Sequence, residues 1–394
     1  MKKSKINKNF ILLAGIGIML IITTVVIISF FRFDVLINNL NKGVPVKILF
    51  AVADENELKF LELFIYSSVT KKAGIYHLPA NLGLKLTSLN RVDAIGVLYK
   101  NNDLGKLKDE VERTTDSEIG FYISFQTSKL VQLIDQIEGV ELFISNPVDI
   151  EYNGKRVLIP SGNVVLDGDK ALDYILYEDI NEESRENIYR KQKVLQAILK
   201  KWGDAAINTE LLNNNGFSLL MDSMQTNITP REMRAFIVEM QSFDSEHIIF
   251  QRVEGKITEI DKKQLLFPYF EGDIIKRSIK QIFENVTSNE IFDGGALDVT
   301  LEILNGTDKN GLAAKTAAVF TQLGYDVVNI TNADRNTYEK TVIREHWGKV
   351  EKATEVARII KCKLIESKVG EDLENTPQIT IILGADFDGR YCKE

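Results

Sequence analysis

An uncharged segment near the N-terminus limits the topologies open to this chain. Residues 10–31 contain no Asp, Glu, Lys or Arg over 22 positions. A helix rises about 1.5 Å per residue, so a helix of this length crosses the roughly 30 Å hydrocarbon core of a bilayer. We therefore predict a single transmembrane helix over residues 10–31.

The residues on either side of this segment predict its orientation. Residues 1–9 form a basic tail with four lysines and no carboxylate. A cleavable signal peptide is the alternative, but its apolar region spans about 7–15 residues and is followed by a cleavage site of small residues. Here the segment ends in Phe30 and Phe31, followed by Arg32. We expect an uncleaved anchor with its N-terminus in the cytoplasm, a short tether over residues 32–43, and every later residue outside.

The composition leaves room for two folded units and gives no sign of nucleic-acid binding. The chain has 394 residues, of which 44% are hydrophobic and 26% charged, and a domain commonly holds about 100–200 residues. The formal net charge of -8 provides no basic surface for phosphate contacts. We therefore expect no nucleic-acid partner.

Cysteine and histidine spacing predicts no metal site. Cys362 and Cys392 match no zinc signature, and His77, His247 and His346 are far apart in the sequence. If the C-terminal part lies on an oxidising side of a membrane, the two cysteines are able to pair. The alternative, two unpaired thiols, stays open.

Short apolar runs alternate with helical segments in the middle of the chain. Strand-like runs cover residues 47–53, 61–66 and 74–78, and helix-like segments cover residues 102–113 and 128–136. A longer helix is predicted because five apolar side chains share one stripe at about 100° per residue: Ile188, Leu195, Ile198, Leu199 and Trp202. Gly203 follows as a stop signal. This alternation predicts a layered α/β domain with a buried sheet over residues 44–287.

Two further helices and a linker end this domain. The run Thr229-Pro230-Arg231-Glu232 is a capping box with proline at the first helical position, which predicts a helix to Gln241. A last helix is predicted over residues 273–284. Residues 288–297 contain two adjacent glycines and are predicted to be a linker.

The last hundred residues have a different order of elements. Strands are predicted at residues 299–304, 325–330, 340–344, 364–369 and 378–383, with helices at residues 311–320 and 350–361. The order is βαββαββ. It predicts a small α+β domain over residues 298–390.

A nine-residue run before the long helix carries a family resemblance. Leu166–Tyr174 reads LDGDKALDY, and Arg190-Lys191-Gln192 follows on the helix. Together with Leu78-Pro79 and Phe121–Val140, this pattern resembles the LytR-CpsA-Psr family. The resemblance implies a membrane-anchored, extracytoplasmic bacterial enzyme that transfers phosphate-linked glycopolymers from a polyprenyl pyrophosphate carrier to peptidoglycan.

The C-terminal unit carries a second resemblance. Leu304-Asn305-Gly306, Leu323–Asn329 and Ile381–Phe387 are similar to the LytR C-terminal domain, and the similarity covers nearly all of the last hundred residues. This module often follows the catalytic domain of the same family. The predicted fold is therefore an N-terminal transmembrane helix, a layered α/β domain and a small α+β domain.

Most charged positions that the resemblance implies are substituted in this chain. The family's Arg-Asp pair after its Ile-Pro turn falls on Ala80 and Asn81, and its earlier Arg-Ser-Asp-Thr falls on residues that include Glu57 and Lys59. The remaining arginine positions fall on Leu176, Glu178 and Asn187. Phosphoryl transfer depends on positioning and charge neutralisation, so these substitutions predict weak catalysis or none.

Four candidate site residues remain. Arg190, Lys191 and Gln192 match the family's helix and are candidates for binding pyrophosphate or another anion. Asp54, at the end of the first strand, is a candidate metal ligand, and Mg²⁺ is implied only for an active enzyme. The alternatives are solvated helix residues and an ordinary strand-end aspartate.

Two functions follow from this pattern. We favour a degenerate relative in the bacterial cytoplasmic membrane that acts in envelope assembly by binding polyprenyl-phosphate lipid, peptidoglycan or envelope proteins. The alternative is an active Mg²⁺-dependent phosphotransferase that uses Arg190, Lys191 and Asp54. Transcription attenuation, a label this family sometimes carries, conflicts with the predicted topology because both domains would lie across the membrane from the chromosome.

Overall fold

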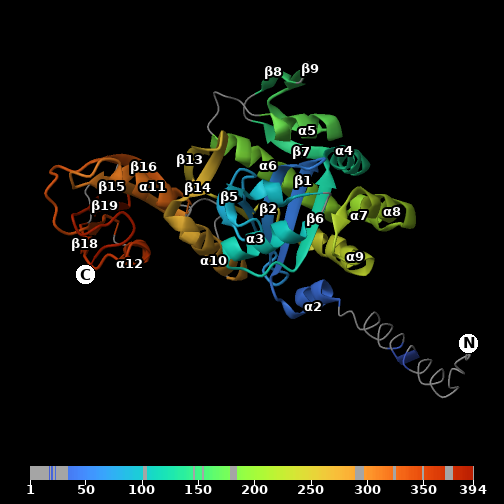
Figure 1. Cartoon of the computed structure of the whole chain (residues 1–394), viewed down its shortest axis with the longest axis horizontal. Coiled ribbons are helices and arrows are strands. Elements are labelled where there is room, and N and C mark those ends of the chain that lie inside the picture. The colour runs from blue at the N-terminus through green and yellow to red at the C-terminus, as the bar shows by residue number, and fades with distance from the viewer. Residues whose placement is uncertain are drawn as a thin grey trace, which may run out of the picture.

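The computed structural model (Figure 1) describes Gly17, Met19, Leu20, Thr23 and most of the chain from residue 34 onward. The described ranges are 34–100, 104–144, 147–152, 155–177, 184–288, 297–322, 325–347, 350–368 and 376–393. Within these ranges no helix is long and apolar enough to cross a bilayer. The predicted span, residues 10–31, lies outside the described residues except for the four named first, so it stays a prediction. The basic tail and residues 289–296 of the linker also lie outside them.

The central element is a six-stranded sheet in the order β11-β6-β1-β2-β3-β12. The strands are Gln225–Thr226 (β11), Phe121–Gln126 (β6), Val46–Asp54 (β1), Glu57–Tyr66 (β2), Ala73–His77 (β3) and Ile248–Arg252 (β12). β6, β1, β3 and β12 run in one direction, and β2 and β11 run antiparallel to their neighbours. β1, β2 and β3 are buried along most of their length, as the apolar runs predicted.

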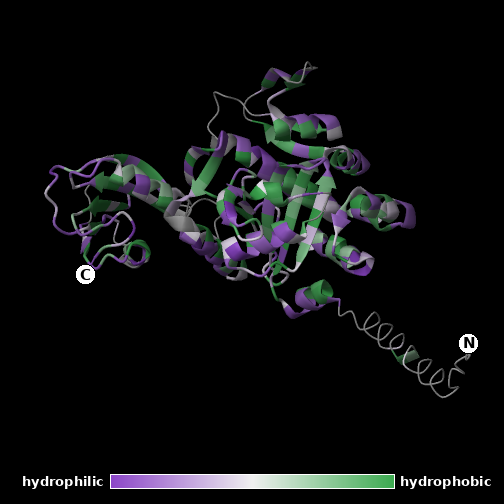
Figure 2. Cartoon of the chain, in the orientation of Figure 1, coloured by the Kyte–Doolittle hydropathy of each residue, from purple (hydrophilic) through white to green (hydrophobic). Residues whose placement is uncertain are grey.

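Helices cover both faces of this sheet (Figure 1). One face packs against Val35–Lys42 (α2), Thr127–Gln136 (α4), Gly168–Leu176 (α5), Ser184–Gly203 (α6), Ala205–Leu212 (α7), Asn214–Ser223 (α8) and Pro230–Glu239 (α9). The other face packs against Gly105–Thr115 (α3) and Asp273–Thr287 (α10). Figure 2 shows hydrophobic residues along the central strands and hydrophilic residues on the outer sides of the helices. The layered α/β architecture predicted from the sequence is confirmed.

Four two-stranded ribbons and three 3₁₀ helices complete the first domain. The ribbons are Gly83–Leu86 (β4) with Arg91–Ala94 (β5), Val140–Ile144 (β7) with Gly162–Leu166 (β10), Val148–Tyr152 (β8) with Lys155–Ile159 (β9), and Gly255–Ile260 (β13) with Lys263–Pro268 (β14). The 3₁₀ helices are Ile95–Leu98 (η1), Met240–Ser242 (η2) and Tyr269–Gly272 (η3). The ribbons extend from the rim of the domain, and β8 and β9 project furthest in Figure 1.

The predicted long helix is α6, and it lies across the central sheet. Its apolar stripe is buried, with Leu195 3%, Ile198 4%, Leu199 0% and Trp202 0% exposed. The helix ends at Gly203, where the backbone approaches the Met240 carbonyl too closely for a side chain: a Cβ on Gly203 would lie 2.2 Å from that oxygen. The stripe and the end of the helix are therefore as predicted.

The segment expected to be a tether contains a helix that packs on the domain. Leu36 of α2 is fully buried, and its backbone N–H donates to Oε1 of Glu232 at 2.9 Å. The other oxygen of Glu232 completes the predicted capping box by accepting from the Thr229 N–H at 3.0 Å. Because one carboxylate serves both helices, the start of α9 also fixes the position of α2.

The C-terminal domain has the predicted βαββαββ order. Its elements are Leu297–Asn305 (β15), Leu312–Gln322 (α11), Tyr325–Asn332 (β16), Val342–Glu345 (β17), Val350–Ile359 (α12), Ile365–Ser367 (β18) and Ile379–Leu383 (β19). The sheet order is β16-β15-β19-β17-β18, in which only the β17–β19 pair is antiparallel. The last strand in the sequence therefore lies in the middle of the sheet, and its five residues are all buried.

Candidate functional site

The carboxyl ends of the four co-directional strands meet at one edge of the central sheet. Asp54 ends β1, His77 ends β3, Gln126 ends β6 and Arg252 ends β12. In α/β sheets this edge is the usual place for a ligand. A ligand site is therefore expected at this edge of the sheet.

An open cavity of about 630 Å³ lies at this edge. It contains the candidate metal ligand and three of the substituted family positions. Its lining residues are Asp54, Glu55, Asn56, Glu57, Leu58, Ala80, Asn81, Ala94, Gly96 and Val97. All charged residues in this lining are carboxylates. The cavity therefore repels a pyrophosphate rather than attracting it.

Local packing explains the residues at the two neutral positions. The Gly96 N–H donates to the Ala80 carbonyl at 2.9 Å, and a Cβ on Gly96 would lie 3.3 Å from Cβ of Ala80. The Asn81 side-chain amide donates to the Gln264 carbonyl at 3.1 Å, and its backbone carbonyl accepts from Leu266 N–H at 2.9 Å. Residues 80 and 81 thus hold η1 and β14 against the end of β3.

The two charged residues at substituted family positions on β2 form an ion pair with each other. Lys59 Nζ lies 2.5 Å from Oε1 of Glu57, and the Glu57 side chain is 73% exposed. Where the resemblance implies an arginine, the chain thus carries a carboxylate that faces solvent.

Asp54 is poorly placed to hold Mg²⁺. It is exposed, and its Oδ1 accepts from the Thr127 hydroxyl at 3.2 Å. In the part of the chain that the structure describes, no group of three or more His, Cys, Asp or Glu side chains is arranged to hold a metal ion. Mg²⁺ prefers about six oxygen ligands in octahedral geometry. The described residues therefore do not fit this ion, and no step is assigned to it.

A second cavity, of about 460 Å³, lies between α6 and the β7–β10 ribbon. It combines apolar walls with basic residues of α6. Its lining residues are Glu141, Leu142, Phe143, Ile144, Val148, Asn163, Tyr174, Tyr189, Arg190, Lys193, Gln196, Ala197, Lys200 and Glu246. Apolar walls with a fixed cation suit a ligand that has both an anionic group and a hydrocarbon part.

Arg190 is held rigidly at the wall of this α6 cavity. Its side chain is 5% exposed, and the guanidinium lies 5.5 Å from the ring centroid of Tyr174 and 4.9 Å from that of Tyr177. One terminal nitrogen donates to the Tyr177 carbonyl at 2.7 Å and to the Asn187 side-chain oxygen. These contacts fix the guanidinium beside the two tyrosine rings. Asn187, at a substituted family position, therefore orients Arg190.

Lys193 extends this basic wall by one helical turn. Its Nζ lies 5.0 Å from the Tyr189 ring centroid and 4.9 Å from that of Phe250. The two rings meet edge to face, with centroids 5.7 Å apart. The ammonium group thus lies over aromatic faces, a position that favours a cation.

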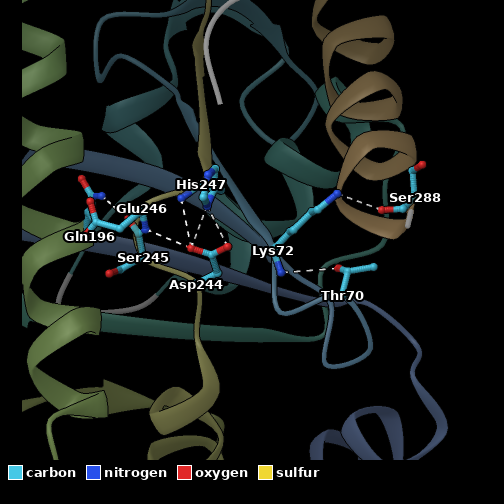
Figure 3. A network of polar contacts seen from close by, with 8 residues as sticks. All are labelled: Thr70, Lys72, Gln196, Asp244, Ser245, Glu246, His247 and Ser288. Atoms are coloured by element: carbon cyan, nitrogen blue, oxygen red, sulfur yellow. Dashed lines mark hydrogen bonds and ion pairs between the residues drawn. The ribbon is translucent and has the colours of Figure 1, made fainter. Parts of the chain in front are cut away.

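The loop that precedes β12 contributes Glu246 to the lining of the α6 cavity. Figure 3 shows that Gln196 donates to the Ser245 carbonyl and that the Asp244 carboxylate contacts the His247 ring at 2.9 Å. Glu246 pairs with Lys200 at 3.0 Å. On the other side of Figure 3, Lys72 Nζ donates to the Ser288 carbonyl at 3.0 Å, which fixes the turn before β3 against the end of α10.

Gln192 faces the sheet instead of a ligand cavity. It is 3% exposed, and its amide donates to the carbonyls of Gln251 at 2.8 Å and Ile75 at 3.3 Å. These bonds tie α6 to β12 and β3. In this structure Gln192 has a structural role that the sequence did not indicate.

A buried ionisable pair lies below α6, and sequence reasoning missed it. Register places Glu62 opposite His77, and Nδ1 of His77 lies 2.6 Å from Oε1 of Glu62. Glu62 is 0% and His77 4% exposed. Burial raises the pKa of Glu62, while His77 and then Lys191 oppose the rise. The positive charge of Lys191, on α6, therefore favours the ionised form of Glu62.

This pKa shift predicts a pH-dependent stability. The folded state binds the Glu62 proton more tightly than the unfolded chain, whose ordinary value is 4.5. Stability is therefore expected to fall as pH rises from this value towards the raised folded value, because only the unfolded state has then released the proton. Glu62→Gln should remove this contribution. Urea unfolding from about pH 4 to 7 measures it, with exposed Glu259→Gln as the control, which should keep the wild-type slope.

The structure thus divides the predicted site residues among three places. Asp54, Glu57, Ala80 and Asn81 line the edge cavity. Arg190 lines the α6 cavity, and Asn187 contacts it. Lys191 acts on the buried pair of Glu62 and His77 below α6, and Gln192 bonds to the central sheet. Leu176 is half-buried against the core, and Glu178 lies outside the described residues. A role of any of them in binding an anion or a metal stays a prediction.

Known families match both domains. The LytR_cpsA_psr family matches residues 86–283, which is half of the chain. The family described as LytR cell envelope-related transcriptional attenuator matches residues 298–387. Both predicted resemblances are therefore confirmed.

Individual relatives are distant. The cell wall biosynthesis protein LcpA of Corynebacterium glutamicum is 23% identical over 257 residues, which are 60% of this chain but only 48% of that protein. TagV of Bacillus subtilis has a TM-score of 0.54 at 16% identity, covering 61% of this chain and 97% of TagV. TagT bound to LIIa-WTA has a TM-score of 0.50 at 14% identity, covering 62% and 91%. At these identities the two structures support the fold alone.

Proposed function

Because this chain belongs to the LytR-CpsA-Psr family, we propose that it acts in bacterial cell wall assembly by binding an amphipathic anionic ligand without transferring its phosphate. One observation carries the proposal. The edge cavity has carboxylates at its charged positions, whereas the fixed cation Arg190 lies in the α6 cavity beside apolar walls. Transfer from a pyrophosphate needs cations around the phosphate, so binding is the function that this arrangement supports.

A polyprenyl-phosphate lipid or its glycan-bearing form is the ligand class that fits best. Its phosphate would face Arg190 and Lys193, and its hydrocarbon part would contact Leu142, Ile144 and Val148. The name of LcpA and the LIIa-WTA bound to TagT support this class. Peptidoglycan and envelope proteins are the alternative partners.

We further propose that the protein lies in the bacterial cytoplasmic membrane. Residues 10–31 would be its single span, and both domains would lie on the extracytoplasmic side. The basic tail and the uncharged segment support this topology. Transcriptional attenuation does not fit it. Protease treatment of intact spheroplasts tests the orientation, and digestion of the C-terminal domain is expected.

The function is tested with the full chain in detergent or nanodiscs and a polyprenyl pyrophosphate, with and without Mg²⁺. We expect binding without phosphate release. Arg190→Ala should weaken binding by about 10–100-fold, since a charge-assisted contact contributes about 1.5–3 kcal/mol. Lys280→Ala, an exposed change on α10, is the matched control and should bind like the wild type.

Three other results of this experiment would each contradict a part of the proposal. Mg²⁺-dependent release that disappears in Arg190→Ala would establish the active transferase instead. Equal binding by Arg190→Ala and the wild type would show that the ligand does not bind in the α6 cavity. Absence of both binding and release would contradict the lipid ligand and favour peptidoglycan or an envelope protein as the partner.

A further inference from the structure

Two thiols from distant parts of the sequence meet in the C-terminal domain. Cys362 follows α12, and its N–H donates to the Ala357 carbonyl at 2.8 Å. The N–H of Cys392 donates to the Ile360 carbonyl at 2.8 Å. Both side chains pack in the apolar cluster of this domain. The main-chain bonds to Ala357 and Ile360 thus hold the two cysteines beside the end of the same helix.

The thiol of Cys362 is buried and contacts the main-chain carbonyls of Thr341 and Leu364. Cys362 is 9% exposed, and its sulfur lies 3.2 Å from the Thr341 carbonyl. Cys392 is half-buried and pairs with Phe387 through a backbone bridge. The hydrogen bond from Cys392 lowers the pKa of Cys362, and the same bond raises the pKa of Cys392.

The C-terminal segment that carries Cys392 also contacts the first domain. Arg390 forms an ion pair with Asp273 at the start of α10. The Tyr391 ring lies 5.1 Å from the Arg277 guanidinium and 4.2 Å from Lys361 Nζ. Arg277 also donates to the Ile359 carbonyl at 3.3 Å. Residues beside both cysteines therefore hold the two domains together.

We propose that Cys362 and Cys392 form a disulfide that fixes the C-terminal segment to the end of α12. A protein or small-molecule disulfide is the oxidant. One cysteine thiolate attacks a sulfur of this oxidant, whose S–S bond breaks and releases one thiol. The second cysteine thiolate attacks the mixed disulfide, forming the internal S–S bond and releasing the second thiol. The two cysteine protons go to the two released thiols, and the oxidant gains two electrons.

The disulfide has a structural consequence at the domain contact. It would tie residues 385–393 covalently to α12, and this segment supplies Arg390 and Tyr391 to α10. The bond would therefore stabilise both the C-terminal domain and its contact with the first domain. Its formation in the cell rests on the proposed extracytoplasmic location. The closeness of the thiols does not.

The first test uses the purified full chain in detergent, which is oxidised with glutathione disulfide and then treated with a maleimide in denaturant, so that both cysteines can react. We expect two maleimides on the reduced chain, none on the oxidised chain, and a peptide pair joined through Cys362 and Cys392 by mass spectrometry. Cys392→Ser should carry one maleimide when reduced and yield no joined pair. Two free thiols or two separate glutathione adducts after oxidation would overturn the proposal.

The second test compares the melting temperature of the oxidised and the reduced wild type. Reduction of the oxidised wild type is expected to lower the melting temperature of the C-terminal domain by roughly 10–30 °C. Cys392→Ser should melt at the same temperature with and without reductant. An unchanged melting temperature of the wild type would overturn the stabilising role.

A third measurement tests whether the disulfide also forms in the cell, where its formation depends on the proposed extracytoplasmic location. Maleimide trapping in intact cells should find both thiols blocked. If both are free in cells although the purified chain oxidises, the disulfide does not form in the cell and the proposal is overturned there. The binding test with Arg190→Ala uses purified protein, so this outcome leaves its result unaffected.

Discussion

His77→Leu is expected to lower the free energy of unfolding by about 3–5 kcal/mol, because it leaves the buried Glu62 carboxylate without its main partner. Glu62 is fully buried, and its Oε1 is 2.6 Å from Nδ1 of His77. Its second oxygen, Oε2, has no hydrogen-bond partner in the part of the chain that the structure describes. Removal of the imidazole therefore leaves the fully buried carboxyl group without its closest hydrogen-bond partner.

A double-mutant cycle tests whether the pair itself is responsible. Glu62→Leu with His77→Leu removes both groups and fills their space with apolar atoms. We expect the double variant to recover most of the loss, since apolar replacement of a buried ion pair is often neutral or stabilising. Urea unfolding of the four proteins gives the coupling energy. A His77→Leu variant within about 0.5 kcal/mol of the wild type would show that the pair contributes little.

The pair shows where sequence reasoning stops. Its two residues are fifteen positions apart in the sequence and meet only because β2 and β3 pair in the observed register. The sequence offered two signals, a carboxylate inside the apolar strand Leu61–Tyr66 and a histidine directly before Leu78-Pro79. Without the register these were an isolated acid and an isolated histidine.

Elements with local signals could be predicted from the sequence. The capping box at Thr229 marked the start of α9, and the stripe ending at Trp202 marked α6. The order of elements after residue 297 followed from period-2 and period-3.6 patterns separated by turn residues. Each of these signals depends only on neighbouring residues.

Elements that depend on distant contacts could not be predicted. α2 is held by the contact between Leu36 and Glu232, so it was expected to be a tether. The β13–β14 hairpin turns at Asp261 and Lys262, which have φ of 50° and 63°. A turn with positive φ at both positions usually carries Asn-Gly, and this one has no glycine to indicate it.

The division of the candidate site between two cavities also has no local signal. Arg190, Lys191 and Gln192 are consecutive on α6, and a helix turns about 100° per residue. Arg190 therefore faces the α6 cavity while Gln192 faces the sheet. The resemblance treats these three residues as one motif, but the structure gives them different surroundings.

Gly168→Ala is expected to lower the free energy of unfolding by about 3 kcal/mol, although alanine is normally the better helix residue by about 1 kcal/mol. Gly168 is the first residue of α5 and belongs to the LDGDKALDY run. A Cβ there would lie 2.3 Å from the Val131 carbonyl oxygen of α4. Its N–H donates to Oδ1 of Asp135 at 2.8 Å, so α5 cannot move away without breaking this bond.

The matched control is Gly120→Ala, because a Cβ on Gly120 meets no atom within 4 Å. It should change the unfolding free energy by less than about 1 kcal/mol. The same pair of variants tests a link to ligand binding. α5 carries Tyr174 and ends beside Tyr177, whose ring and carbonyl position Arg190.

A displaced α5 should therefore weaken polyprenyl pyrophosphate binding in Gly168→Ala under conditions where the variant remains folded, while Gly120→Ala binds normally. Equal stability and binding of the two variants would show that the glycine is not required for the contact between α4 and α5. Loss of stability with unchanged binding would instead mean that Arg190 keeps its position without α5. The motif retained in this chain would then serve the fold alone.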